Sequence, residues 1–206
     1  MGGGEESIEV KEVVFDMLSV FEKSILPRLL SISEETKRYL VFTAWLNTLL
    51  EEKRLGRIII TGGFAVEVYT GRVYRTMDVD VIVEGSSRVV ELFLEKFSEK
   101  IGRGYLPTYE ILSLKSIDIV STVYARRRGP VKLLVEEFYV YLDPVEDLVA
   151  VYLSGWKFWG STEDRDKAIW LLYTWRDKID WKYLEEICKE QSVIDKLEEL
   201  KQLISV

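Results

Sequence analysis

Residues 57–83 decide the fold, and they read RIIITGGFAVEVYTGRVYRTMDVDVIV. The run at 57–61 is short, β-branched and apolar, which is typical of a strand that is buried on both faces. A Gly-Gly pair ends this run, residues 64–70 have helical spacing, and residues 77–84 alternate with the period of two that marks a strand. The stretch therefore predicts a strand, a turn, a short helix and a second strand.

The segments on either side predict helices before this stretch, more strands directly after it and helices alone at the end. We expect an α/β (α+β) core with a small mixed sheet, in which the last two predicted strands form a hairpin. The expected helices are 9–30, 33–55, 64–70, 87–100, 145–159, 162–175, 181–189 and 193–203, and the expected strands are 57–61, 77–84, 116–123 and 131–142. The expected parts are N-terminal helices at 1–55, the core at 56–143 and a C-terminal helical subdomain at 144–206.

Composition limits the chemistry that the chain can perform. The 206 residues include no histidine and one cysteine, Cys188, so histidine-based nucleophilic pairs, internal disulfides and thiolate metal sites are excluded. We expect Cys188 to pack between helices. The net charge of -7 argues against non-specific coating of nucleic acid, although it permits a local basic patch. No apolar run approaches the roughly 20 residues that cross a bilayer, so we expect a cytoplasmic protein with no membrane partner.

Two aspartates stand out in the second strand of the deciding stretch. Asp78 and Asp80 are two residues apart, so both side chains leave the same face of a strand. Two like charges side by side repel, unless solvent at an exposed edge or a bound cation offsets them. Mg²⁺ prefers carboxylate oxygens and phosphate oxygens, and Mn²⁺ accepts the same ligands. Asp118 interrupts another apolar strand, and it completes the carboxylate set if the two strands pair in register.

The glycine pair Gly62 and Gly63 lies where the buried strand meets the short helix. Glycine lets the backbone approach a ligand closely, and a helix N-terminus presents N–H groups to phosphate. By placement the pair predicts a phosphate-binding turn. A plain tight turn here and a solvated strand edge at the aspartates are the alternatives for the two motifs taken singly.

In this order and spacing, the Gly-Gly turn and the Asp-Val-Asp-Val strand resemble the nucleotidyltransferase superfamily (polymerase-β-like). The segment is similar in particular to minimal nucleotidyltransferases and to type IV abortive-infection toxins, which share an Arg-x-Thr-x-Asp-apolar-Asp form. Arg75 and Thr76 occupy the first two of those places. The resemblance covers about 57–83, with weaker agreement through the Asp118 strand and the helix that opens at 144–148. It implies a nucleotidyltransferase core.

The resemblance also implies roles for individual residues. Asp78, Asp80 and Asp118 would bind Mg²⁺ or Mn²⁺, and Asp118 would also act as base toward an attacking hydroxyl. The nucleotide-binding set would be Gly62, Gly63, Arg75 and Thr76. Toxin-like members often have a lysine where this chain has Tyr152, so Lys157, farther along the same helix, is the remaining candidate for phosphate. A solvated helix position is the alternative for Lys157.

We therefore expect a metal-dependent enzyme that moves a nucleoside monophosphate from a nucleoside triphosphate such as ATP to a hydroxyl of RNA, protein or a small molecule. A toxin with an antitoxin partner is one form of this expectation, and an inactive nucleotide-binding regulator is the alternative. The arginines 126–128 favour an exposed turn over an RNA contact. The late tryptophans favour helix packing over base stacking; they are Trp156, Trp159, Trp170, Trp175 and Trp181.

Overall fold

The computed structural model describes residues 8–204 of the chain, and these residues form two compact units. The first unit contains the residues up to Ile59 together with Met77–Tyr124 and Lys132–Val140. The second unit contains Ile60–Thr76, Ala125–Val131 and the residues from Tyr141 onward. The expected limits at 1–55, 56–143 and 144–206 stay a prediction.

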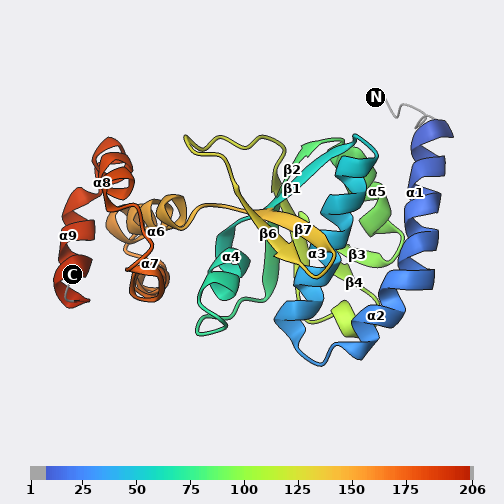
Figure 1. Ribbon diagram of the computed structural model, residues 1–206, viewed down its shortest axis with the longest axis horizontal. Helices are drawn as coiled ribbons and strands as arrows, with labels where there is room; N and C mark the ends of the chain where they lie inside the picture. The colour runs from blue at the N-terminus through green and yellow to red at the C-terminus, as the bar shows by residue number, and fades with distance from the viewer. Residues whose placement is uncertain (1–7, 205–206) are drawn as a thin grey trace. The chain divides into compact units, whose positions relative to one another are not determined.

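The first unit combines a group of helices with almost all of the sheet (Figure 1). Helix α1 packs against α5, and Phe21 lies against the rings of Phe42, Phe93 and Phe97 in its aromatic core. The helical elements are α1 (Ile8–Val20), the π-helical turn η1 (Phe21–Ile25), α2 (Leu26–Ser31), α3 (Glu35–Glu52), α5 (Ser87–Glu95) and the 3₁₀ turn η2 (Glu110–Leu112). The strands are β1 (Gly56–Ile60), β2 (Asp78–Gly85), β3 (Ser98–Ile101), β4 (Gly104–Pro107), β5 (Ser116–Ser121), β6 (Val131–Val135) and β7 (Phe138–Leu142).

Among the described residues these strands form a seven-stranded sheet in the order β3-β4-β5-β2-β1-β7-β6. Strand β2 lies between β5 and β1, and it pairs with β5 in parallel. Strand β4 pairs with β5 in the antiparallel sense, so the sheet is mixed, as the sequence predicts. The predicted neighbourhood of the Asp78–Asp80 strand and the Asp118 strand is confirmed.

Two sequence predictions about the sheet are wrong. The helix expected over 87–100 ends at Glu95, and β3 and β4 follow as an antiparallel pair that the sequence does not predict. The expected hairpin between the strand of Asp118 and the 131–142 segment does not form, because β5 lies between β4 and β2. The 131–142 segment instead contains both β6 and β7, which are neighbours at the other end of the sheet.

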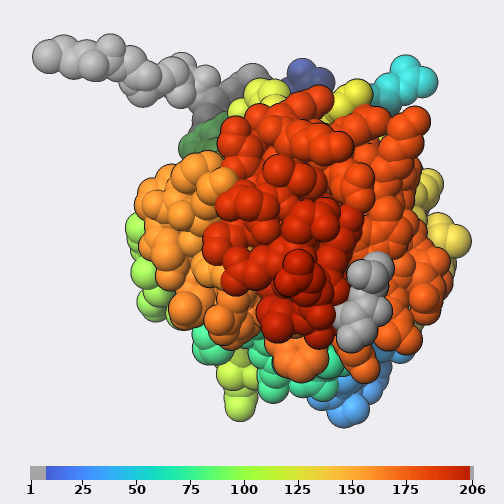
Figure 2. Space-filling model, turned by 90° about the vertical axis from the view of Figure 1, so that its left-hand side faces the viewer, coloured from blue at the N-terminus to red at the C-terminus, as the bar shows by residue number. Residues whose placement is uncertain are grey.

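The second unit is built around helices that pack on one another. Helix α6 packs against α7, α8 and α9, and α4 packs against α6 and α7. Figure 2 shows the orange-to-red atoms of the C-terminal helices in close mutual contact. Cys188 is buried in α8, and burial raises its thiol pKa to about 12, which agrees with the packing role expected for it. The helices are α4 (Gly62–Tyr69), α6 (Val145–Trp159), α7 (Thr162–Trp175), α8 (Trp181–Glu190) and α9 (Ile194–Leu203).

The late tryptophans do not form the core that the sequence predicts for this part of the chain. Trp159 is 81% exposed and Trp170 is 40% exposed, and the other three are half-buried. Aliphatic side chains such as Leu171 and Leu184 occupy the interior instead. The tryptophan spacing is helical, but the faces that pack together carry smaller residues.

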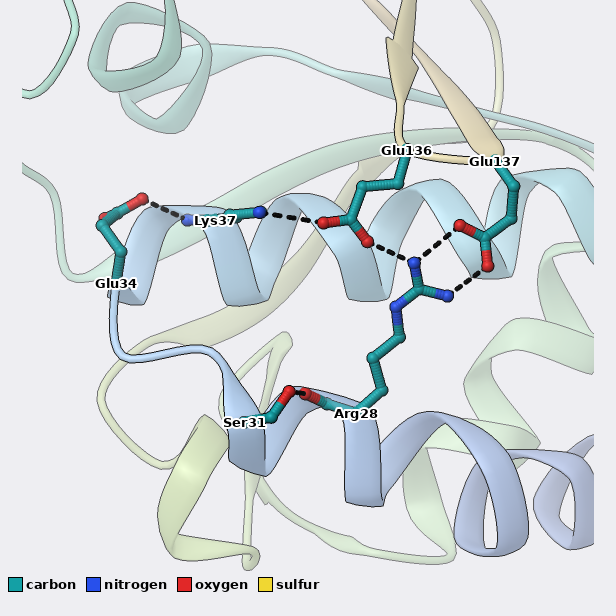
Figure 3. A network of polar contacts seen from close by, with 6 residues as sticks. All are labelled: Arg28, Ser31, Glu34, Lys37, Glu136 and Glu137. Atoms are coloured by element: carbon teal, nitrogen blue, oxygen red, sulfur yellow. Dashed lines mark hydrogen bonds and ion pairs between the residues drawn. The ribbon is translucent and has the colours of Figure 1, made fainter.

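An exposed network of charged side chains joins the β6–β7 turn to α2 and α3 (Figure 3). The guanidinium of Arg28 donates hydrogen bonds to both Glu136 and Glu137, one of them 2.6 Å long, and Lys37 forms an ion pair of 2.9 Å with Glu136. The bond from Arg28 lowers the pKa of the Glu137 carboxyl to about 2. These contacts hold the turn within the first unit.

Within residues 8–204, no helix is both long enough and apolar enough to cross a lipid bilayer.

Candidate functional site

The two aspartates of β2 share a face because the strand alternates, as predicted. Val79 and Val81 point into the core and are at most 2% exposed, whereas Asp78 and Asp80 are half-exposed. In the parallel pairing of β2 with β5, Asp80 lies directly beside Asp118 and Asp78 beside Ser116. Residues in register on neighbouring strands point to the same side of a sheet. The structure therefore brings the side chains of Asp80 and Asp118 to one face.

The carboxylate of Asp118 lies toward β4, on the opposite side of β5 from β2. Asp118 is in register with Gly104, and a Cβ added to Gly104 would be only 2.2 Å from Oδ1 of Asp118. Glycine at position 104 thus leaves the space that this carboxylate occupies. Among the described residues, Oδ1 of Asp118 is buried and has no hydrogen-bond partner. A buried carboxylate oxygen without a partner is costly, so an external ligand would relieve it.

The carboxylates of β2 and β5 are candidate ligands for a divalent cation. No group of three acidic, histidine or cysteine side chains gathers closely enough to form a ready metal centre anywhere within residues 8–204. Mg²⁺ does not require one, because it commonly takes one or two carboxylates and completes its shell with water and substrate phosphate. Asp80 and Asp118 lie on one face and fit that mode of binding when the Asp118 carboxylate turns from Gly104 toward Asp80.

Two features of the Gly62–Gly63 turn, a backbone angle and a close contact, explain why both positions are glycine. Gly62 has a φ of 59°, a left-handed value that side chains rarely adopt. Gly63 has an ordinary φ, but a Cβ there would be 2.9 Å from Oγ1 of Thr76. The hydroxyl of Thr76 thus lies close against the first turn of α4. Two residues of the predicted nucleotide-binding set, Gly63 and Thr76, are adjacent in the second unit.

Two buried acidic residues, which the sequence reasoning missed, support this turn from the same unit. Glu67 is fully buried on α4 and accepts the backbone N–H of Thr76 at 3.0 Å. Asp143 is also fully buried and accepts a hydrogen bond from the hydroxyl of Thr61. A glutamate inside the apolar run 64–68 was the available signal for Glu67. Asp143 gives no local signal, because its partner is 82 residues away.

The remaining predicted residues have these positions. Arg75 is exposed at its place before Thr76. Lys157 donates to the carbonyl of Ser192 at 2.7 Å and forms an ion pair of 2.6 Å with Asp195. Phosphate binding by Lys157 would require that pair to open.

The arginines at 126–128 lie in a turn that is exposed in part, with Arg127 exposed and Arg126 and Arg128 half-buried. Each one is engaged within the second unit: Arg126 pairs with Asp143, Arg127 with Glu190 and Arg128 with Asp180. The bond to Asp180 raises the pKa of the Arg128 guanidinium, and this guanidinium also stacks over the ring of Tyr183 at 3.8 Å. The arginines thus fix the 125–131 segment to the helices.

Asp147, at the start of α6, is a second buried acid near this arginine segment. Its carboxylate accepts the Tyr183 hydroxyl at 3.1 Å. Burial raises the pKa of Asp147, and the Tyr183 bond and the charge of Arg126 oppose that rise. The same burial raises the pKa of the Tyr183 hydroxyl to about 12. The pair is structural in its contacts, since both partners are satisfied.

One solved structure shares this architecture. A crystal structure of an antigenic nucleotidyltransferase-like protein from Paracoccidioides brasiliensis is 16% identical, with a TM-score of 0.54 over 84% of this chain and 93% of that one. The chain has a nucleotidyltransferase-like fold. The fold expected from the sequence resemblance is confirmed.

Two structures of the antibiotic-resistance factor ANT(2'')-Ia are more distant from this nucleotidyltransferase-like fold. The solution structure is 16% identical with a TM-score of 0.47, covering 78% of this chain and 94% of that one. The crystal structure with adenylyl-2''-tobramycin is 17% identical with a TM-score of 0.48, covering 75% and 95%. No family model matches the sequence, and the search of curated proteins finds no significant match.

Proposed function

We propose that the chain is a metal-dependent nucleotidyltransferase, which moves a nucleoside monophosphate from a nucleoside triphosphate to a hydroxyl acceptor. The observation that carries this proposal is the pair Asp80 and Asp118, in register on adjacent parallel strands, with a buried oxygen of Asp118 that has no partner among the described residues. The nucleotidyltransferase-like fold supports it.

In the proposed reaction the aspartates would bind the metal, and the glycine turn would bind the phosphates. Asp78, Asp80 and Asp118 would hold Mg²⁺ or Mn²⁺, which supplies charge stabilisation on the phosphates. Gly62 and Gly63 would bind phosphate oxygens through backbone N–H groups, and Arg75 and Thr76 would contact the nucleotide. Lys157 belongs to this set only if its Asp195 pair opens.

The reaction forms one bond and breaks one. The acceptor oxygen bonds to the α-phosphorus, the bond from that phosphorus to the oxygen bridging the β-phosphorus breaks, and pyrophosphate leaves. The proton of the acceptor hydroxyl goes to the carboxylate of Asp118, which acts as general base. No residue outside the carboxylate set is needed for that proton, which agrees with the absence of histidine.

A second candidate function is nucleotide binding without turnover. The direction of the Asp118 carboxylate favours it, because this side chain lies over Gly104 and toward β4 instead of toward Asp80. A binding protein would keep the Gly62–Gly63 turn and lose transfer. The two candidates therefore differ in one measurable property, the release of pyrophosphate.

The test is incorporation of radiolabel from each α-labelled nucleoside triphosphate, with Mg²⁺, into total RNA, into protein and into a set of hydroxylated small molecules. Wild type should label one acceptor class, and Asp78→Asn and Asp80→Asn should not. Asp16→Asn, an exposed position on α1, is the matched control and should label like wild type. Full activity in Asp78→Asn or Asp80→Asn would refute the assigned roles, and triphosphate binding without label would favour the binding protein. A toxin role and an antitoxin partner stay predictions, tested by growth arrest on expression.

A further inference from the structure

Asp143 forms hydrogen bonds with several residues around the glycine turn, although it lies far from that turn in sequence. Its carboxylate accepts the Thr61 hydroxyl and is paired with Arg126, whose Nη2 is 3.1 Å away and whose Nε is 3.3 Å away. Its backbone N–H donates to the carbonyl of Ile60 at 2.9 Å, and its carbonyl accepts the hydroxyl of Tyr69 at 2.9 Å. Ile60 precedes the turn and Tyr69 ends α4, so Asp143 contacts the chain on both sides of Gly62–Gly63.

The hydrogen bond to Asp143 prevents the Thr61 side chain from capping the N-terminus of α4. Thr61 is the N-cap residue of α4, and threonine in that place ordinarily accepts a hydrogen bond from a first-turn N–H. Here the Thr61 side chain makes no cap bond, because its hydroxyl is turned to Asp143. The first turn of α4 therefore lacks its usual side-chain cap.

Burying the Asp143 carboxylate costs free energy, so packing alone does not account for an aspartate at this position. Asp143 is 0% exposed, and a buried carboxylate is tolerated only with charged and hydrogen-bonding partners. Arg126 supplies the charge, with its own side chain 27% exposed, and Thr61 supplies a neutral donor. A hydrophobic residue at 143 would avoid the burial cost if packing were the only requirement.

We propose that Asp143 is a positioning residue for the phosphate turn, because it holds Thr61 away from the N-terminus of α4 and fixes the backbone that enters Gly62. The proposal rests on the function proposed above, in which Gly62 and Gly63 bind phosphate. It adds a residue that touches no substrate, and it identifies the Thr61–Asp143 hydrogen bond as the working contact. Arg126 supplies the opposite charge beside the Asp143 carboxylate, at 3.1 Å.

The bond can be removed at Thr61 without altering Asp143 or Arg126. Thr61→Val keeps the shape and deletes the hydroxyl, whereas Thr61→Ser keeps the hydroxyl. Thr70→Val is the matched control, because Thr70 is a buried threonine at the other end of α4 whose hydroxyl donates to the carbonyl of Val66. Thr61→Val loses its hydrogen bond to Asp143, and Thr70→Val loses its bond to Val66 and a long bond of 3.5 Å from the Tyr74 N–H, so Thr70→Val should lower the melting temperature at least as much.

The experiment measures binding of ATP and of inorganic triphosphate, each with Mg²⁺, by titration calorimetry on the full chain. Thr61→Val should bind about tenfold more weakly, the size of a misplaced binding group, whereas Thr61→Ser and Thr70→Val should stay within about twofold of wild type. Unchanged binding by Thr61→Val, with wild type binding normally, would overturn the role of Asp143 and leave the proposed function standing. Failure of wild type to bind either phosphate probe would overturn both.

Discussion

The carboxylate strands of the first unit and the glycine turn of the second unit satisfy their polar groups in opposite ways. In the turn, buried Glu67 and Asp143 have hydrogen-bond partners from the same unit, and Thr61 and Thr76 are held by them. In the strands, the buried Oδ1 of Asp118 has no partner among the described residues, and Gly104 leaves room for it. The polar groups of the turn are thus satisfied within the protein, whereas Asp118 leaves one oxygen without a hydrogen-bond partner among the described residues.

The largest expected effect comes from a substitution of a strand carboxylate, Asp118. Asp118→Asn should lower the transfer rate by about a thousandfold, because it removes the residue that we propose as general base. Without metal, the same variant should raise the free energy of unfolding by up to about 1 kcal/mol, because it removes the charge of a carboxylate whose Oδ1 is buried without a partner among the described residues. The measurements are pyrophosphate release and denaturant unfolding in chelator, with Asp16→Asn as the control. Lower stability together with normal turnover would contradict the assignment of Asp118.

Removing the support of the glycine turn should weaken nucleotide binding by a smaller factor than Asp118→Asn lowers the transfer rate. Unlike Asp118→Asn, it should lower the free energy of unfolding. Glu67→Ala removes the acceptor of the Thr76 N–H, which should weaken nucleoside triphosphate binding about tenfold and cost about 1–3 kcal/mol of stability. Glu67→Gln keeps a carbonyl oxygen at the same place and should bind within a fewfold of wild type. Calorimetric titration of both variants checks the pair. Equal affinities for Ala and Gln would show that the bond to Thr76 does not position the site.

A change at Gly104 sharpens the comparison, since it acts on Asp118 without altering its chemistry. In Gly104→Ala, the new Cβ would meet the end of the Asp118 side chain, which can rotate at small cost. Because β2 lies on the other side of β5, the carboxylate should move toward Asp80 and Mg²⁺ affinity should rise severalfold. Mg²⁺-dependent melting measures this, since a ligand that binds only the folded state stabilises it. A fall in affinity would show that the present direction of Asp118 is the binding one.

The smallest effect concerns the exposed network of Figure 3, in which the carboxylates are satisfied by protein and no ligand is invoked. The Arg28 bond depresses the pKa of Glu137 to about 2, so its contribution is present above the ordinary glutamate value and is lost as pH falls toward 2. Glu137→Gln should therefore make unfolding slightly less dependent on pH between about 4.5 and 2. It should leave triphosphate binding at neutral pH unchanged. Acid titration followed by circular dichroism measures the first effect, and an unaltered acid limb would contradict the role of the Arg28–Glu137 pair.

The sequence predicts the parts of the fold that depend on local pattern. Alternation places Asp78 and Asp80 on one face, and the apolar run around Asp118 predicts the strand that pairs beside them. The pair β3 and β4 is missed because residues 98–107 contain two glycines and a proline, and their burial does not alternate cleanly. The exposure of Trp159 depends on which helix faces meet, which one sequence does not state.

The site is predicted only in part, for a similar reason. Glycine and aspartate spacing identifies the Gly62–Gly63 turn and the Asp78–Asp80 pair, because those features lie within the 27 residues 57–83. The Thr61–Asp143 bond and the engagement of Arg126 are long-range contacts with no spacing rule. The roles assigned to the individual residues stay predictions until they are measured.

The central claim is that the chain transfers the α-phosphoryl group together with its nucleoside. It is tested most directly by supplying one nucleoside triphosphate labelled either at the α- or at the γ-phosphorus, with Mg²⁺ and the acceptor fraction. The account predicts α-label in the acceptor, γ-label only in released pyrophosphate, and neither product with Asp80→Asn. Label from the γ-position in the acceptor, or α-label transfer that survives in Asp80→Asn, would contradict it.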